Sequence, residues 1–222
     1  MAAGFFDQLT HVLHLALGFS AAGAAVVALS ARKGDRTHRY AGWVFAIAMT
    51  IAALTAWAFM IARPLPLAMV QATMTFYGLG MALLAINPHW QRAKAIEWAL
   101  FIVLIVVLAG MIAVSVNLYR AGGPVPFVAP LIMAAIFAVF LVSDWRYLRL
   151  ERVSRFNRLR RHSLYMALTL SFTVSAPLIT FADDLALPVP AIVFGSFLLI
   201  PLVYYAFTPQ AARAAEVESS PS

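Results

Sequence analysis

The sequence predicts an all-α fold, a polytopic transmembrane bundle of seven helical spans. Three observations predict it. First, 63% of the 222 residues are hydrophobic and 11% are charged, whereas a soluble domain is nearer half apolar and a quarter charged. Second, uncharged stretches of about twenty residues recur, and each can cross a bilayer core of about 30 Å as a helix. Third, basic residues gather in alternate connections between these stretches, a pattern typical of multi-pass proteins.

The first expected helix has no Lys or Arg ahead of its apolar run. A cleaved secretory signal needs a positive segment there, so we expect this helix to remain in the mature chain. Small residues on one of its faces favour close packing against the second helix. These residues are Gly18, Ala21, Ala22 and Ala25.

Pro and Gly mark the ends of the following helices, at residues 63–66, 87–88 and 121–124. A basic segment that we expect to break near 154–157 separates the fifth helix from the sixth, and an acidic pair separates the sixth from the seventh. One domain, 1–208, is therefore expected, followed by a polar and disordered tail, 209–222. The seven expected helices are about 9–31, 40–62, 66–87, 95–118, 125–147, 162–182 and 187–207.

The charge distribution predicts the orientation of the bundle. Fourteen of the sixteen Lys and Arg residues fall on one side of the membrane if the spans alternate, and Arg63 and Arg120 fall on the other. The positive-inside rule then places the N-terminus outside and the C-terminus in the cytoplasm. The absence of cysteine from the sequence excludes disulfides, thiolate catalysis and Cys-based metal sites.

Three of the five histidines, His38, His89 and His162, are expected just before helices that start on the cytoplasmic side. Each has basic neighbours, and helix N-termini favour anions, so contact with lipid headgroups is one interpretation. Another is a b-type haem with His38 and His162 as axial ligands and with Arg39 and Arg161 at the rim of the site. A quinone, or a metal ion held by all three histidines, is a further alternative. The sequence leaves the cofactor undecided.

His11 and His14 lie one turn apart near the outer end of the first helix. They are interpreted either as an interfacial histidine pair or as a proton-accepting or metal-contacting site that faces the periplasm. The carboxylates Glu97 and Asp144, at cytoplasmic helix ends, are expected to pair with nearby Arg or His. No charged residue is expected in the middle of a span, which argues against a proton-coupled pump.

Arginine recurs at every third position between the fifth and sixth helices. A period of three drifts around a helix, so this segment is not a regular amphipathic stripe. We expect it to anchor the cytoplasmic side and to attract anionic lipid headgroups, by about 1 kcal/mol per basic residue, and not to bind nucleic acid. The residues expected to contact lipid are Arg146, Arg149, Arg152, Arg155 and Arg158.

Polar side chains within the third and sixth helices are expected to form interhelical hydrogen bonds. Gln71 and Thr75 lie four residues apart, and the sixth helix carries several hydroxyls. A polar cavity between these two helices is the alternative. The hydroxyls of the sixth helix are Thr169, Ser171, Thr173 and Ser175.

Several short motifs occur one after another between residues 10 and 205. They include His14 and Gly18, Ala31-Arg32-Lys33-Gly34, His38-Arg39, Gly42, Val44-Phe45, Met49, Thr75-Phe76-Tyr77, and Arg160-Arg161-His162 with Met166. With these motifs the chain resembles a family of bacterial multi-pass membrane proteins catalogued as domain of unknown function 2306. Tyr165 stands where that family usually has Trp. The resemblance implies a membrane fold and location, and it implies no activity.

Two classes of function therefore remain open. The first is a non-enzymatic protein of the bacterial inner membrane that is structural, accessory, or binds lipid or another amphipathic ligand. The alternative is a membrane redox protein that binds b-type haem or quinone at the cytoplasmic interface through His38 and His162. Whether the protein is an enzyme is left undecided by the sequence.

Overall fold

The computed structural model describes residues 2–62, 66–87, 92–121, 128–150 and 153–207. Within these ranges the chain forms helices and no strand. Seven of these helices are long and apolar enough to cross a membrane, which confirms the all-helical class and the expected number of spans. The helices are α1 (Ala2–Ser30), α2 (Arg36–Ala62), α3 (Pro66–Ile86), α4 (Ala93–Arg120), α5 (Val128–Leu148), α6 (Arg155–Thr180) and α7 (Val189–Phe197).

The helical path of α7 is interrupted at Leu198 and continues over residues 199–207. Pro201 explains the interruption, because proline lacks the N–H that would bond to the carbonyl of Phe197 and its ring crowds that carbonyl. At the interruption, the N–H of Leu198 is shared between the carbonyls of Phe194 and Gly195. The two pieces together span Val189–Phe207, long enough to cross a membrane.

The start of the sixth helix is where the boundary prediction is wrong. We expect it at about residue 162, but α6 begins at Arg155. Ser154 caps it, because its extended backbone leaves the side-chain oxygen free to accept the N–H of Asn157 at 3.2 Å. His162 therefore lies two turns inside α6, and the free N–H groups of the helix start are not beside it.

A side-chain cap also marks the start of α2. Asp35 accepts the backbone N–H of His38 at 2.6 Å, so the helix begins at Arg36 and His38 lies in its first turn. The tight turn before it contains Gly34 with φ of 84°, a left-handed conformation that glycine adopts without steric cost.

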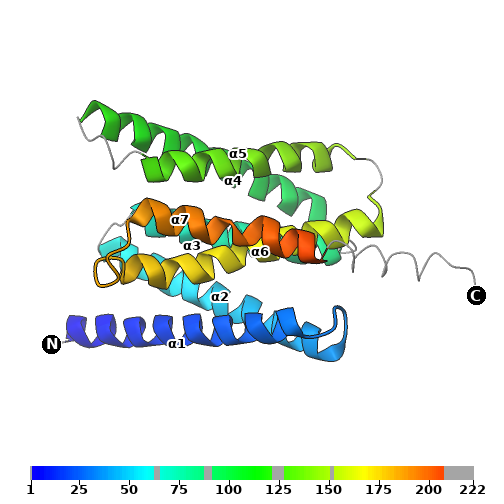
Figure 1. The fold of residues 1–222 in the computed structure, drawn as a ribbon, viewed down its shortest axis with the longest axis horizontal. Coiled ribbons are helices and arrows are strands. Elements are labelled where there is room, and N and C mark those ends of the chain that lie inside the picture. Colours follow the sequence, from blue (N-terminus) through cyan, green and yellow to red (C-terminus); the bar gives the residue numbers. More distant parts are fainter. Residues whose placement is uncertain (1, 63–65, 88–91, 122–127, 151–152, 208–222) are drawn as a thin grey trace, which may run out of the picture.

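The helices are arranged as three groups (Figure 1). The α1–α2 pair forms one edge of the bundle, the α4–α5 pair forms the opposite edge, and α3, α6 and α7 lie between them. The α1–α2 turn, the end of α3 and the start of α6 meet at one end of the bundle, which we call the basic end. It carries the basic residues Arg32, Lys33, Arg36, Arg39, Arg92, Lys94, Arg146, Arg149, Arg155 and Arg158.

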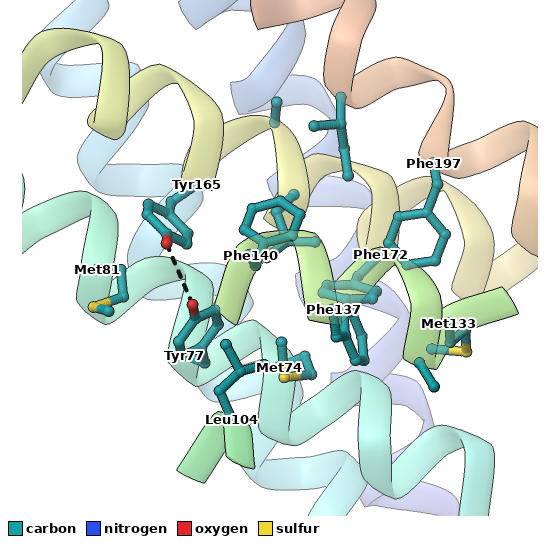
Figure 2. Packing of buried hydrophobic residues seen from close by; sticks show 14 of the residues in the cluster. Met74, Tyr77, Met81, Leu104, Met133, Phe137, Phe140, Tyr165, Phe172 and Phe197 are labelled. Carbon is teal, nitrogen blue, oxygen red and sulfur yellow. Dashed lines mark hydrogen bonds between the residues drawn. The ribbon is translucent and has the colours of Figure 1, made fainter. Parts of the chain in front are cut away.

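The main core is aromatic and joins α3 through α7 (Figure 2). Phe137 of α5, Phe172 of α6 and Phe197 of α7 contact one another edge to face, with ring centroids 5.6–6.4 Å apart. Lipid tails are as apolar as these rings, so close packing, more than escape from water, holds the helices together in a bilayer.

A second core joins α1 to α2 through small residues, as expected. Ala21 and Ala25 are buried against Phe45 and Met49. Gly18 is not part of this contact, because a Cβ atom there would meet nothing within 4 Å. Gly78 of α3 lies close to α6, where a Cβ atom would lie 2.6 Å from the Thr169 hydroxyl and 3.4 Å from the Tyr165 carbonyl oxygen.

The expected interhelical hydrogen bonds are confirmed for one pair. Gln71 of α3 donates its Nε2 to the Ser175 hydroxyl of α6 at 3.0 Å. The Thr75, Thr169 and Thr173 hydroxyls lie within hydrogen-bond distance of carbonyls four residues earlier in their own helices. Thr173 also lies 3.3 Å from the sulfur of Met49 in α2. A single bond of the first kind contributes about 0.6–2 kcal/mol in a membrane bundle.

Candidate functional site: a cavity with two histidines at the basic end

A cavity of about 480 Å³ lies at the basic end, and we call it the His38/His162 cavity. Its walls come from α1, the α1–α2 turn, α2, the end of α3, the first half of α6 and the last turns of the seventh span. His38 and His162 both line it, although 124 residues separate them in the chain. The bundle thus brings the two predicted site histidines to one cavity.

The His38 ring is fixed by the end of the preceding helix. Its Nδ1 lies 3.0 Å from the carbonyl oxygen of Ala28. A carbonyl can only accept, so Nδ1 carries the proton and donates it. When the ring is neutral, Nε2 on its other edge carries the lone pair that can accept from a ligand.

The His162 ring is held in the same way by a different helix. Its Nδ1 lies 3.0 Å from the carbonyl oxygen of Ala82 in α3, so this ring also donates from Nδ1. The bond fixes the position of α6 against α3 as well as the tautomer of the ring. Both cavity histidines therefore have a defined orientation before any ligand is present.

Lys33 closes the end of α1 beside the cavity. Its ammonium donates to the carbonyl oxygens of Ala28 at 2.8 Å, Leu29 at 2.7 Å and Ala31 at 3.2 Å, carbonyls that would otherwise lack partners at a helix end. It also lies 4.1 Å from the centre of the Phe207 ring. Partial burial lowers the pKa of Lys33, and the nearby Asp35 carboxylate partly opposes this effect.

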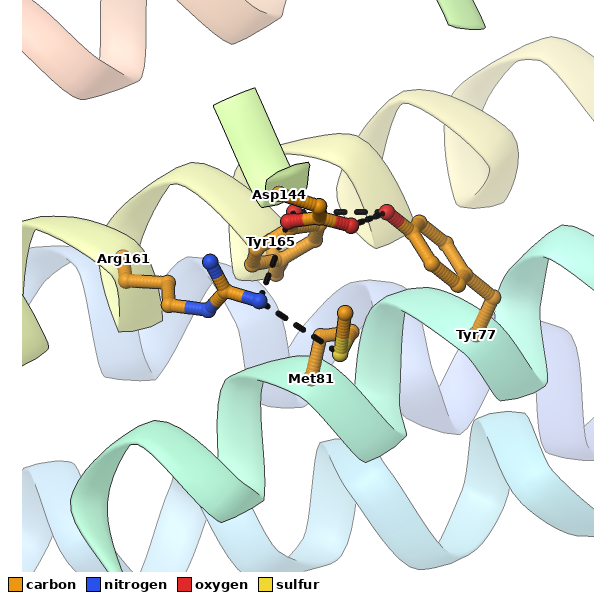
Figure 3. Close-up of polar contacts among 5 residues, drawn as sticks. All are labelled: Tyr77, Met81, Asp144, Arg161 and Tyr165. Carbon is orange, nitrogen blue, oxygen red and sulfur yellow. Dashed lines mark hydrogen bonds and ion pairs between the residues drawn. The ribbon is translucent and has the colours of Figure 1, made fainter. Parts of the chain in front are cut away.

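Two of the arginines expected at the basic end also line the cavity. Arg39 is exposed and lines it from α2, and Arg155 lines it from the first turn of α6. Arg161 does not line it. Its side chain is 5% exposed and reaches Asp144 of α5 instead (Figure 3). Of the four residues expected at a shared site, the structure thus brings together His38, His162 and Arg39.

Arg161 belongs to a separate buried polar cluster, which we call the Asp144 cluster (Figure 3). Its Nη2 lies 3.0 Å from Oδ1 of Asp144, whose side chain is fully buried. The hydroxyls of Tyr77 and Tyr165 donate to the two oxygens of the same carboxylate, and Arg161 also contacts the sulfur of Met81 at 3.6 Å. The expected pairing of Asp144 with a basic residue is confirmed.

The cluster joins three helices through one carboxylate. Asp144 comes from α5, Tyr77 from α3, and Tyr165 and Arg161 from successive turns of α6. The two tyrosine hydroxyls lie 3.3 Å apart, and the Arg161 guanidinium lies 3.7 Å from the centre of the Tyr147 ring. The sequence does not predict that either tyrosine belongs to a polar cluster. The spacing of four residues does place Arg161 and Tyr165 on one face of the helix, and this is the signal that could have indicated Tyr165.

The arginines at the basic end are not equivalent. Arg146 and Arg149 are exposed, and Arg149 stacks on Trp145 at 4.0 Å from the ring centre. Arg160 bonds to the hydroxyl of Tyr204. Arg152 lies outside the described residues. A lipid contact at these positions stays a prediction.

The remaining histidines lie elsewhere. His14 has its Nδ1 3.0 Å from the Ala52 carbonyl and from the Thr55 hydroxyl. His11 packs edge to face on Phe59, with ring centroids 5.9 Å apart. His89 lies outside the described residues. Within the described part of the chain, no three His, Asp or Glu side chains gather as metal ligands.

Comparisons of the chain with protein-family models, with curated proteins and with solved structures found no match. The features of the structure that bear on function are the His38/His162 cavity and the Asp144 cluster.

Proposed function

We propose that the protein is a multi-pass protein of the bacterial inner membrane that binds an amphipathic small molecule in the His38/His162 cavity, without catalysing a reaction. In this proposal the N-terminus is outside and the basic end faces the cytoplasm, in line with the fourteen basic residues on one side of the predicted topology. The resemblance to the family of unknown function supports the location alone.

The observation that carries the proposal is that two imidazoles with fixed tautomers line one largely apolar cavity. Each Nδ1 is bonded to a backbone carbonyl at 3.0 Å, so each ring presents a defined hydrogen-bond acceptor. Apolar side chains such as Phe45 and Leu170 line the same cavity. Ligand sites commonly combine apolar walls with a few polar groups that fix orientation.

The test is to identify what the purified protein carries. Molecules that remain bound after gentle detergent extraction would be released with organic solvent and identified by mass spectrometry. Gly42→Leu should abolish retention, because Gly42 lines the cavity and a Cβ atom there meets nothing within 4 Å, so the added side chain fills the cavity without disturbing its neighbours. Equal retention by wild type and Gly42→Leu would contradict the proposal.

The matched control is His11→Phe, which changes an exposed histidine near the other end of α1. It should retain the same molecule in the same amount as the wild type. Monodispersity on size-exclusion chromatography checks that both variants are folded.

A b-type haem is the second candidate, and one observation favours it. Histidines that ligate metals usually donate their other ring nitrogen to a carbonyl or carboxylate, as both cavity histidines do. His38 and His162 would hold the iron through Nε2 and Arg39 would face a propionate, and the haem would supply one-electron redox chemistry. A stoichiometric Soret band in the purified protein would support this candidate, and its absence would exclude it.

A further inference from the structure

The charged residues among the described residues of the cavity lining are all basic. Lys33, Arg39 and Arg155 contribute three cations. None of the described residues that line the cavity is Asp or Glu. Asp35 is close in sequence, but one of its carboxylate oxygens accepts the backbone N–H of His38 and it is not among the lining residues. The lining thus complements an anion and disfavours a ligand with a positively charged end.

Polarity changes along the cavity. Arg155, in the first turn of α6, and Leu170, on the same helix, both line it, and fifteen helical residues cover about 22 Å. His162 lies between them, about 10 Å from the level of Arg155. Beyond His162 and Ser163 the α6 residues that line the cavity are apolar, namely Met166, Ala167 and Leu170. A ligand that follows this wall has a charged head and an apolar tail.

The two imidazoles add a requirement that cations alone do not impose. With Nδ1–H donated to a carbonyl, Nε2 of the neutral ring accepts a hydrogen bond. Phosphate diester oxygens also only accept, so they match Lys33, Arg39 and Arg155 but not Nε2 of His38 or His162. A ligand that satisfies both sets needs an anionic group and, next to it, hydroxyl donors.

We infer that the His38/His162 cavity binds an anionic phospholipid whose headgroup carries free hydroxyls, such as a glycerol headgroup. The phosphate lies near Arg39 and Arg155 and is attracted by the charge of Lys33, whose N–H groups already donate to carbonyls at the end of α1. The hydroxyls donate to Nε2 of His38 and His162, and an acyl chain follows the apolar wall toward Leu170. This inference rests on the proposed function, because it names the ligand class of the same cavity.

The experiment compares three lipids with identical acyl chains, added to the delipidated full-length protein and followed by native mass spectrometry. Phosphatidylglycerol has the charge and the hydroxyls, phosphatidylmethanol has the same charge without hydroxyls, and phosphatidylethanolamine is zwitterionic, with an ammonium group beyond its phosphate. Phosphatidylglycerol should bind about three- to tenfold more tightly than phosphatidylmethanol, the factor that one or two net hydrogen bonds contribute. Phosphatidylethanolamine should bind more weakly than both.

Variants separate the two parts of the headgroup. Arg39→Gln should weaken phosphatidylglycerol and phosphatidylmethanol by the same factor, since both lose a phosphate partner. His38→Phe and His162→Phe should remove the preference for phosphatidylglycerol over phosphatidylmethanol. His11→Phe is the control and should change neither.

The outcomes decide between the inference and the function beneath it. Equal binding of the glycerol and methanol lipids by the wild type overturns the inference and leaves an amphipathic ligand site. Equal binding of all three lipids by wild type and Gly42→Leu overturns both, because the lipid is then not in the cavity. Competition by glycerophosphoglycerol, the deacylated headgroup, overturns the lipid as the source and assigns the cavity to a soluble phosphodiester.

Discussion

Arg161 and His162 are consecutive in α6, yet their side chains serve two different sites. Arg161 pairs with Asp144 at 3.0 Å in the buried cluster, and His162 bonds to the Ala82 carbonyl and lines the cavity. Adjacent residues of a helix point about 100° apart, so the two side chains leave the same turn of α6 in different directions. The neighbouring residues Met81 and Ala82 of α3 receive the two contacts.

The Asp144 cluster should behave as a structural ion pair. Arg161→Met leaves a buried carboxylate without its cation and should lower the free energy of unfolding by about 3–5 kcal/mol. Asp144→Leu combined with Arg161→Met removes both charges and should recover most of the loss. Thermal unfolding in detergent measures this, with the exposed Arg146→Gln as the control. A double variant no more stable than Arg161→Met would show that the pair is not the source of the stability.

The same double variant should keep its ligand. Arg161 does not line the His38/His162 cavity, so its loss leaves the lining residues in place. Phosphatidylglycerol binding by native mass spectrometry should match the wild type. Loss of binding in a variant that is folded would mean that the cluster and the cavity are coupled through α6.

Gly78 should be sensitive to the addition of one methyl group. A Cβ atom there lies 2.6 Å from the Thr169 hydroxyl and 3.4 Å from the Tyr165 carbonyl, so Gly78→Ala should cost about 1–3 kcal/mol through overpacking. Thr169→Ala removes the nearer atom and should restore stability in the double variant. Gly110→Ala in α4 meets nothing within 4 Å and should be neutral or stabilising, because alanine favours helix. Equal melting temperatures for Gly78→Ala and Gly110→Ala would contradict the close α3–α6 approach.

Lys33 should make the stability of the folded chain vary with pH in the alkaline range. Burial lowers its pKa in the folded chain below the ordinary value of 10.5. Between these two pKa values the unfolded chain holds a proton that the folded chain has released, so stability rises with pH there. Lys33→Gln should remove this increment, seen as a flatter dependence of the melting temperature on pH just below 10.5. Identical slopes for the two proteins would show that Lys33 does not titrate in this range.

The predicted orientation can be tested with reporters. A reporter fused after Ser222 should read as cytoplasmic, and one fused to a chain truncated after Arg120 should read as periplasmic, because seven spans with basic residues on alternate connections require it. A periplasmic signal from the fusion after Ser222 would overturn the assignment of every connection.

The arginines between α5 and α6 should hold lipid at the surface through charge. Replacing Arg149, Arg152, Arg155 and Arg158 together with Gln should reduce the number of retained anionic lipids, since each basic residue near the surface contributes about 1 kcal/mol. The same four replacements with Lys preserve the charge and should preserve retention. Unchanged retention by the Gln variant would show that these residues act only within the protein.

The all-helical class and the number of spans could be predicted from the sequence, because the length of an apolar stretch is a local property that must match the thickness of the bilayer core. The sequence also predicts the small-residue face of α1 and a basic partner for Asp144. The break expected near 154–157 is confirmed by the cap at Ser154, whereas the expected start of the sixth span at about 162 is wrong, since the helix begins at its cap and not at its apolar run.

Only the tertiary structure decided which polar groups meet. His38 and His162 come from helices far apart in sequence, and their convergence on one cavity depends on how α1, α2, α3 and α6 pack. The separation of Arg161 from His162, and the recruitment of Tyr77 and Tyr165 to Asp144, follow from the rotation of each helix about its own axis. Apolar faces in a bilayer differ little in their tendency to pack or to face lipid. Close contacts such as that of Gly78 with α6 therefore determine the rotation of each helix about its axis, and those contacts exist only once the helices are assembled.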